Sequence, residues 1–222
     1  MTKTLTGAIL SFLGVTLGAT KKPERKNSES HEIFQDLNKP SKQINEIKEC
    51  CYDLQKFVHY FVKGRSGVPF KLNPMQESLA SEVDGPWFKS LNRISERRSG
   101  KTTFLAIFAL REMILHSNQR IAYVSPTLNI SKAGFFAEFK NLLKELPVEL
   151  MKTLRLTIED QTSNSIRLSN GSVLFIMPAS CCSFRGMEIS TLLVDEYNEI
   201  RDYQGLKKVY TPGVRSLVEL SS

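Results

Sequence analysis

The chain has little cysteine and little histidine, which excludes several classes of protein. Only 4 cysteines and 3 histidines occur among 222 residues. The cysteines form two adjacent pairs, Cys50-Cys51 and Cys181-Cys182, and these match neither the Cys-x-x-Cys spacing of zinc sites nor a disulfide framework. We therefore expect reduced thiols in a cytosolic setting and no dedicated zinc site.

Residues 4–20 lack any charged side chain, yet the features of a secretory signal or a membrane span are also missing. There is no small-x-small cleavage pattern, and three glycines interrupt a stretch that would need about 20 strongly apolar residues to cross a bilayer. Five apolar residues recur at helical spacing, namely Leu5, Ile9, Phe12, Leu13 and Leu17. The favoured interpretation of this stretch is an amphipathic docking helix. A disordered segment is the second alternative, and a secretory segment is the third.

The overall composition is that of an ordinary globular protein with a basic balance. Hydrophobic residues make up 41% and charged residues 24% of the chain. A chain of this length can bury one core with at most a small appendage. The net charge of +7 favours a polyanionic partner such as nucleic acid.

Composition and periodicity divide the chain into three parts. Residues 1–31 hold the apolar segment and then a linker, because residues 21–31 are charged and contain no apolar side chain. Residues 32–64 form a helical lead-in, since apolar residues recur at helical spacing from Ile33 to Val62. Residues 65–222 hold the main domain.

Strands and helices alternate in this main domain. Short apolar runs predict strands at 88–94, 120–125 and 191–195, and amphipathic or wholly apolar stretches predict helices at 102–116 and 135–146. Asn170-Gly171, between two further runs, predicts a two-residue hairpin of type I′. We expect an α/β fold with a mainly parallel sheet, helices on both faces and a β-hairpin insertion.

Residues 95–103 form the first of two motifs that carry chemistry. In a phosphate-binding loop, backbone N–H groups surround the phosphates, the lysine reaches the β and γ oxygens, and the next hydroxyl ligates Mg²⁺. The usual first glycine is absent here, and Ser95 takes its place; the alternative is a solvated, basic helix start. The predicted nucleotide-binding residues are Ser95, Glu96, Arg97, Arg98, Ser99, Gly100, Lys101, Thr102 and Thr103.

The second motif is Asp195-Glu196, which closes an apolar strand. A carboxylate at a strand end can hold the metal, so Thr102 and Asp195 are the predicted Mg²⁺ ligands. Glu196 is the predicted catalytic residue that polarises the attacking water. The alternative is a strand that runs into an acidic turn. In this order, the two motifs predict a P-loop ATPase with ATP and Mg²⁺ as cofactors.

Three further side chains are candidates for this site. Arg97 lies inside the loop, where a guanidinium can stabilise charge on the transferred phosphoryl group, so it is the predicted catalytic arginine. Arg185 is a possible second arginine or a surface residue of a turn. Gln76 offers an amide that can both donate to and accept from an adenine edge, or it is a surface glutamine.

These residues, in this order, resemble the ATPase half of the large terminase subunit of tailed bacteriophages. The similar stretch runs from about Cys51 to Glu199. It comprises Gly67-Val-Pro-Phe-Lys-Leu-Asn-Pro-Met-Gln76, Arg97-Arg98-Ser99-Gly100-Lys101-Thr102-Thr103, Ser169-Asn-Gly-Ser-Val173, Arg185-Gly186 and Leu193-Val-Asp-Glu196. The resemblance implies an additional-strand, recA-like P-loop domain that drives viral DNA packaging.

The resemblance also implies partners and a location. Expected partners are double-stranded DNA, bound through its backbone, the portal and the small terminase subunit, within an oligomer and without a membrane. The expected location is the cytoplasm of the infected host cell.

The residues after Glu196 depart from the family pattern. They hold no acidic cluster able to bind two metals, so we expect no nuclease in this polypeptide. The expectation is a C-terminally incomplete ATPase domain, with the nuclease half encoded downstream as one alternative. A strand beside the Asp-Glu strand is not predicted either, which leaves an exposed strand edge. Nucleotide binding is therefore a firmer expectation than turnover.

Two other functions agree with the same residues. One is another P-loop ATPase on nucleic acid, such as a helicase fragment, although a helicase requires a second recA-like domain. The other is a non-hydrolysing fragment that binds nucleotide or a partner chain.

Overall fold

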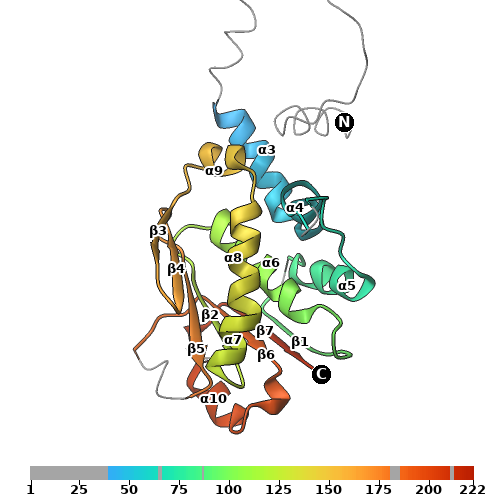
Figure 1. Ribbon diagram of the computed structural model, residues 1–222, viewed down its shortest axis with the longest axis vertical. Coiled ribbons are helices and arrows are strands. Elements are labelled where there is room, and N and C mark those ends of the chain that lie inside the picture. The colour runs from blue at the N-terminus through green and yellow to red at the C-terminus, as the bar shows by residue number, and fades with distance from the viewer. Residues whose placement is uncertain (1–39, 65–66, 87, 181–185, 211–212) are drawn as a thin grey trace, which may run out of the picture.

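The fold is built on a seven-stranded sheet with the strand order β1-β7-β6-β2-β5-β4-β3 (Figure 1). The computed structural model describes residues 40–222 except 65–66, 87, 181–185 and 211–212. The strands are β1 (Ser90–Ile94), β2 (Arg120–Ser125), β3 (Ile158–Gln161), β4 (Ser165–Leu168), β5 (Val173–Pro178), β6 (Thr191–Asp195) and β7 (Ser216–Ser221). The pairs from β1 through β7, β6 and β2 to β5 are parallel, and β5-β4 and β4-β3 are antiparallel. The expected α/β fold with a mainly parallel sheet is confirmed.

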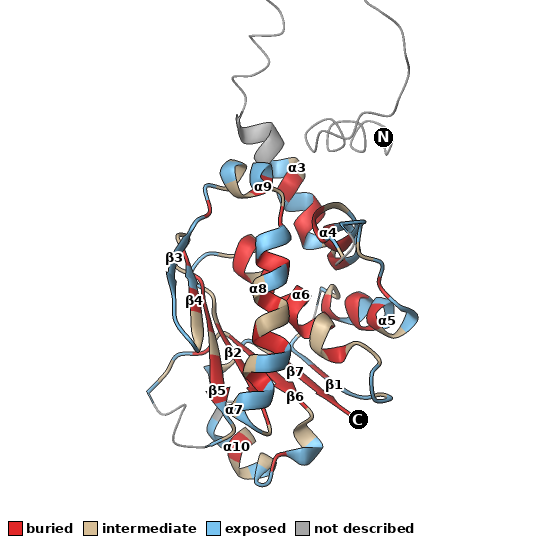
Figure 2. Ribbon diagram, in the orientation of Figure 1, coloured by how far each residue is buried: buried red, intermediate tan, exposed pale blue. Residues whose placement is uncertain are grey.

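Alternate residues of the central strands face two separate cores. Ile121 and Tyr123 of β2 join a large core, whereas Ala122 and Val124 join a smaller one, as the two-residue period of a strand requires. Strands buried on both faces read as continuous apolar runs, and every residue of β6 is buried. Figure 2 shows this burial along β6 and β7, in contrast to the exposed β3.

Helices cover both faces of the sheet, as expected. Helices α3 (Pro40–Tyr52), α4 (Leu54–Phe61), α5 (Pro74–Val83) and α6 (Lys101–Leu115) contribute to the large core. So do α8 (Ala137–Glu145) and α9 (Val148–Thr153), whereas α10 (Tyr203–Tyr210) covers the small core. The expected helical lead-in therefore shares one core with the main domain. No described helix is long and apolar enough to cross a membrane.

The helical pattern expected from Ile33 to Val62 corresponds, where it is described, to two helices. Asp53 separates α3 from α4 because its carboxylate accepts a hydrogen bond from the N–H of Lys56, at 2.9 Å, and so begins a new helix. The apolar segment, the charged linker and residues 32–39 lie outside the described residues.

A short π-helix leads into α8. The chain leaves β2 through α7 (Leu128–Ser131) and the π-helix η1 (Lys132–Phe136), and α8 follows without a break. A π-helix is wider than an α-helix and occurs often at functional sites. Here it carries two phenylalanines, Phe135 and Phe136, and both are buried.

The Asn170-Gly171 hairpin forms, but the predicted turn type is wrong. Type I′ needs positive φ at both central residues, and of this pair only Gly171 has it, at +82°. The N–H of Leu168 bonds the carbonyl of Ser172, so the loop has three residues and Gly171 takes the left-handed position. The hairpin extends the main sheet through the pairing of β5 with β2.

The last strand corrects a second expectation. β7 lies between β1 and β6 and pairs in parallel with both. A strand beside the Asp-Glu strand is therefore present, and the expected exposed edge at this position is wrong. The 3₁₀-helix η3 (Tyr197–Glu199) links β6 to the segment that leads through α10 to β7.

Candidate nucleotide site

The two predicted motifs meet at one edge of the sheet. The loop of residues 95–100 connects the carboxyl end of β1 to the first residue of α6, and Asp195-Glu196 stands at the carboxyl end of β6. Strand β7 lies between these two ends and brings Ser221-Ser222 to the same edge. Ligands of open α/β sheets bind at this edge, and a helix N-terminus favours negative charge.

The backbone of the loop is fixed by Gly100 and its neighbours. Gly100 has φ of +85°, a left-handed conformation that favours glycine. A Cβ atom at this position would lie 2.7 Å from Nε2 of Gln76. Nε2 of Gln76 donates to the Gly100 carbonyl at 2.9 Å, and Nδ2 of Asn73 donates to the Ser99 carbonyl, also at 2.9 Å. Two residues at the start of α5 therefore hold the end of the loop.

Gln76 is buried, and both of its polar atoms are engaged. Its Oε1 accepts from the N–H of Asn73 at 3.0 Å while the Asn73 side chain accepts from the N–H of Gln76, a reciprocal cap of α5. The side chain is 2% exposed. Its expected contact with an adenine edge stays a prediction, whereas its contact with the loop is direct.

Lys101 is a buried cation at the centre of the site. Its Nζ donates to the Glu96 carbonyl at 3.0 Å and to Oγ of Ser222 at 3.1 Å, and it lies 3.5 Å from Oε1 of Glu196. The side chain is 5% exposed. A buried ammonium is stable only among such acceptors.

Glu196 is held by the end of β7. Its Oε1 accepts from Oγ of Ser222 at 2.7 Å, and its Oε2 accepts from the N–H of Ser222 at 2.8 Å. The backbone of Glu196 is left-handed, with φ of 50°, a conformation that is rare outside glycine and clusters at functional sites. Burial raises the pKa of Glu196, but the Ser222 hydroxyl and N–H and the Lys101 ammonium outweigh it and hold the pKa below its usual value.

Asp195 and Thr102 provide oxygen atoms that fit a divalent cation. Oδ2 of Asp195 accepts from Oγ1 of Thr102 at 2.7 Å and from the hydroxyl of Tyr123 at 2.9 Å. Oδ1 is buried and has no hydrogen-bond partner in the described part of the chain. A buried carboxylate oxygen left without a donor suits a cation, and Mg²⁺ needs only one or two carboxylates when phosphates supply further ligands. No group of three or more histidine, cysteine or acidic side chains that could hold a metal occurs among the described residues.

The structure describes two of the three predicted arginines, Arg97 and Arg98, and both are exposed. Arg97 is exposed over 79% of its side chain, and its guanidinium pairs with Glu199 at 3.2 Å. Arg98 is also exposed and has a positive φ of 63°. Arg185 and the Cys181-Cys182 pair lie outside the described residues.

The remaining predicted hydroxyl residues lie in the loop and at the start of α6. The hydroxyls of Ser95 and Ser99 are hydrogen-bonded to each other at 3.1 Å, and Thr103 follows Thr102 in the first turn of α6.

Sequence reasoning missed Asn73, Tyr123 and Ser222 as members of this site. For Tyr123 the sequence gives a weak signal, since the residue lies in a predicted strand. The structure places that strand beside β6, with Tyr123 on the same face as Asp195. Asn73 precedes a proline at a helix start, which marks a cap but does not reveal its second bond to the loop. No local signal identifies Ser222, because its role depends on a strand that was not predicted.

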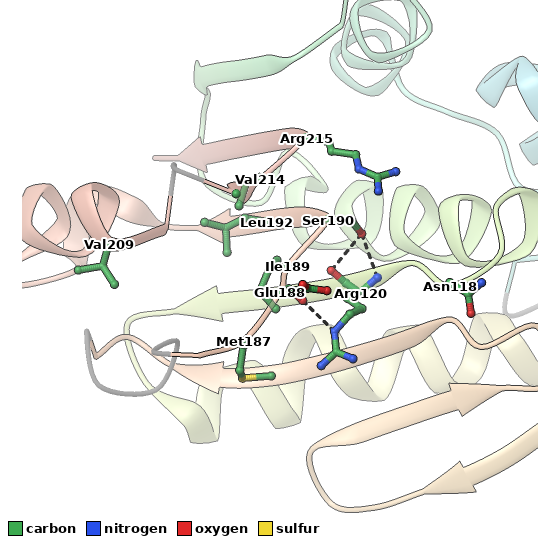
Figure 3. A pocket seen from close by; sticks show the side chains of 11 residues that line it. Asn118, Arg120, Met187, Glu188, Ile189, Ser190, Leu192, Val209, Val214 and Arg215 are labelled. Atoms are coloured by element: carbon green, nitrogen blue, oxygen red, sulfur yellow. Dashed lines mark hydrogen bonds between the residues drawn. The ribbon is translucent and has the colours of Figure 1, made fainter.

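A cavity of about 470 Å³ lies at the opposite edge of the sheet. Figure 3 shows Arg120, Ser190 and Arg215 beside the amino ends of β2, β6 and β7, and Leu192 is among the apolar residues that line the cavity. Nε of Arg120 donates to the Glu188 carbonyl at 2.8 Å. The length of β2, roughly 20 Å at 3.3 Å per residue, separates the cavity from the phosphate loop, so the cavity is no part of that site.

Comparisons with known proteins agree with this fold. A family model described as "Terminase large subunit, T4likevirus-type, N-terminal" matches residues 96–217, which is more than half of the chain. The large terminase of bacteriophage HK97 is similar in structure, with a TM-score of 0.62 and 17% identity over 78% of this chain and 37% of that chain. The large terminase of a thermophilic bacteriophage gives a TM-score of 0.50 and 11% identity, over 68% of this chain and 39% of that chain. No curated protein sequence matches.

Proposed function

The chain belongs to the family of T4-like large terminase subunits, in their N-terminal region, and from this we propose that it binds and hydrolyses ATP to drive viral DNA packaging. The chain spans 37% of the length of the HK97 large terminase, so the activity is proposed for the ATPase portion of such a motor. One observation carries the proposal. Lys101, Thr102, Asp195 and Glu196 converge at the carboxyl edge of a parallel sheet, next to a helix N-terminus.

Each residue of the site has a separate task in this proposal. The backbone N–H groups at the start of α6 and the Lys101 ammonium bind the phosphates. Oγ1 of Thr102 and the carboxylate of Asp195 would hold Mg²⁺. When bound, the cation neutralises charge on the phosphate oxygens. The exposed Arg97 turns from Glu199 toward the transferred phosphoryl group, and Gln76 keeps the loop in place.

Glu196 takes up the proton of the attacking water in this scheme. In the structure its carboxylate contacts Lys101 and Ser222, which keep it ionised but weakly basic. Phosphates compete with Glu196 for the Lys101 ammonium, so nucleotide binding weakens that contact. The carboxylate then becomes more basic and accepts a proton more readily.

The proposed partners follow from charge and family. The net charge of +7 supports contact with the backbone of double-stranded DNA, which suits a motor that moves any sequence. By family, the portal and the small terminase subunit are further partners of an oligomer in the infected host cell. Residues 65–222 form the proposed ATPase domain, residues 32–64 its helical lead-in, and residues 1–31 an apolar segment and a linker.

Two substitutions test the proposal. Lys101→Ala abolishes binding of Mg²⁺-ATP in calorimetry, because it removes the cation that faces the phosphates. Glu196→Gln retains binding but loses hydrolysis, because an amide cannot accept the proton. Lys144→Ala, at an exposed lysine of α8, and Glu188→Gln, at an exposed glutamate beside β6, serve as matched controls.

The outcomes separate the competing functions. Unchanged Mg²⁺-ATP affinity in folded Lys101→Ala protein contradicts the phosphate-loop assignment. Binding without turnover in the wild type, with and without DNA, favours a non-hydrolysing fragment. Equal turnover by the wild type and Glu196→Gln contradicts the role of Glu196.

A further inference from the structure

Tyr123 is a buried tyrosine whose hydroxyl contacts the Asp-Glu motif. It lies on β2, is 1% exposed, and donates to Oδ2 of Asp195 at 2.9 Å. Burying a hydroxyl costs free energy unless it is hydrogen-bonded. Phenylalanine would fill the same space at a lower cost, so core packing alone does not explain a tyrosine here.

The ring of Tyr123 is held by an aromatic stack from the π-helix. Its centroid lies 3.7 Å from that of Phe135, with 11° between the ring planes. Phe135 in turn stacks on Phe139 of α8. All three rings are fully buried, so the direction in which the Tyr123 hydroxyl points is fixed by packing.

The two oxygens of Asp195 have different surroundings. Thr102 and Tyr123 both donate to Oδ2, whereas Oδ1 is buried without a donor in the described part of the chain. Two donors from different elements fix the rotation of the carboxylate. One oxygen is thereby kept toward the protein, and the other remains for a cation.

We propose that Tyr123 is a positioning residue, which orients Asp195 for the Mg²⁺ that accompanies the nucleotide. This inference rests on the proposed function, since it concerns the same nucleotide site. The hydroxyl acts through Asp195 and does not itself contact the nucleotide or the reacting atoms. Groups that orient metal ligands in this way typically change metal affinity by about 10–100-fold when removed.

Nucleotide binding with and without the cation tests this role. The dissociation constant of ADP is measured by calorimetry in excess Mg²⁺ and in EDTA, and the ratio of the two reports the gain due to Mg²⁺. In Tyr123→Phe this gain falls by about tenfold, while the affinity in EDTA stays as in the wild type. Phe135→Leu keeps the hydroxyl but removes the ring that supports it, and gives a smaller loss.

A matched control exists on the other face of the sheet. Tyr203 donates its hydroxyl to Glu219, a buried carboxylate that faces α10, so Tyr203→Phe makes the same chemical change there. We expect Tyr203→Phe to keep the full gain due to Mg²⁺. Urea unfolding of each variant confirms that the binding data come from folded protein.

The possible outcomes are distinct. An unchanged gain in Tyr123→Phe overturns the inference and leaves the proposed function intact. Equal losses in Mg²⁺ and in EDTA also overturn it, since they indicate a purely structural role. A wild-type chain that binds no ADP in either condition overturns the proposed function and this inference with it.

Discussion

Gly100 offers a sharp test of how the phosphate loop is built. Two features forbid a side chain there: the φ of +85° and the closeness of Gln76, whose Nε2 atom would lie 2.7 Å from a Cβ. Substitution by alanine therefore strains the backbone and displaces a buried amide. We expect Gly100→Ala to reduce both stability and nucleotide affinity.

The magnitude follows from these two effects. A left-handed conformation costs an L-residue about 1–2 kcal/mol. Displacing Gln76 breaks its 2.9 Å bond to the Gly100 carbonyl, worth about 1 kcal/mol. The sum of about 2–3 kcal/mol corresponds, for a chain of this size, to a fall in Tm of roughly 4–12 °C. Losing one hydrogen bond from the loop to a phosphate, at about 1.5 kcal/mol, weakens Mg²⁺-ATP binding by about tenfold.

Urea unfolding and calorimetry measure the two effects. Gly134→Ala is a matched control, because a Cβ at Gly134 meets nothing within 4 Å and the residue lies in a helix. That variant is neutral or more stable by up to about 1 kcal/mol. Gln76→Ala combined with Gly100→Ala relieves the close contact, so the double variant is less destabilised than the sum of the single variants.

A result within about 0.5 kcal/mol of the wild type, the range of ordinary surface substitutions, with unchanged Mg²⁺-ATP affinity, would refute this reasoning. Strict additivity of the two substitutions would refute the specific role of the Gln76 contact. The backbone cost would then account for the whole effect.

Two further predictions concern Arg97, in the loop of residues 95–100, and the buried cysteines of α3. Arg97→Gln lowers the rate of ATP hydrolysis by about 10³-fold with little change in ATP affinity, whereas the neighbouring Arg98→Gln does not; equal losses in single-turnover assays would contradict the assignment. Burial raises the pKa of Cys51 to about 12 and that of Cys50 above its usual value, so both are neutral thiols at pH 8. Mass spectrometry after iodoacetamide treatment finds them unmodified in native protein and modified in urea, and rapid native labelling would show that α3 opens readily.

Much of the fold was predictable because local pattern and tertiary packing agree. The predicted strand at 120–125 has the same bounds as β2, and helix 102–116 differs from α6 by one residue at each end. Both are apolar nearly throughout, as elements buried on all sides must be. The Gly-Lys-Thr tripeptide marked the start of α6 correctly, since only a residue tolerant of positive φ fits before it.

The unpredicted elements owe their structure to distant residues. β7 carries a glutamate in its middle, which breaks the apolar pattern of a buried strand. Glu219 is buried because Asn92 of β1 and Tyr203 and Lys207 of α10 donate to its carboxylate. β3 is an edge strand with all four residues exposed, so it has no apolar periodicity to detect.

The turn at Asn170-Gly171 shows the same competition at a smaller scale. Its dipeptide favours type I′, but Nδ2 of Asn170 donates to the Met113 carbonyl at 2.7 Å, at the end of α6. The Asn170 side chain therefore donates to a carbonyl at the end of α6, and the loop has three residues. A similar limit applies to Gln76, whose bond to Gly100 depends on the arrangement of α5 beside the loop.

The position of β7 also constrains the order in which the molecule can fold. β1, which leads into the phosphate loop, has β7 as its strand partner in the described sheet, and the paired residues Asn92 and Glu219 are 127 positions apart. Pairings so distant in sequence close a long loop and are slow to form. During synthesis the strands from β2 to β6 can assemble first, while β1 stays unpaired until residues 216–221 leave the ribosome. The loop of residues 95–100 therefore becomes ordered only after residues 216–221 have been synthesised, and a ligand of this loop cannot assist the earlier stages of folding.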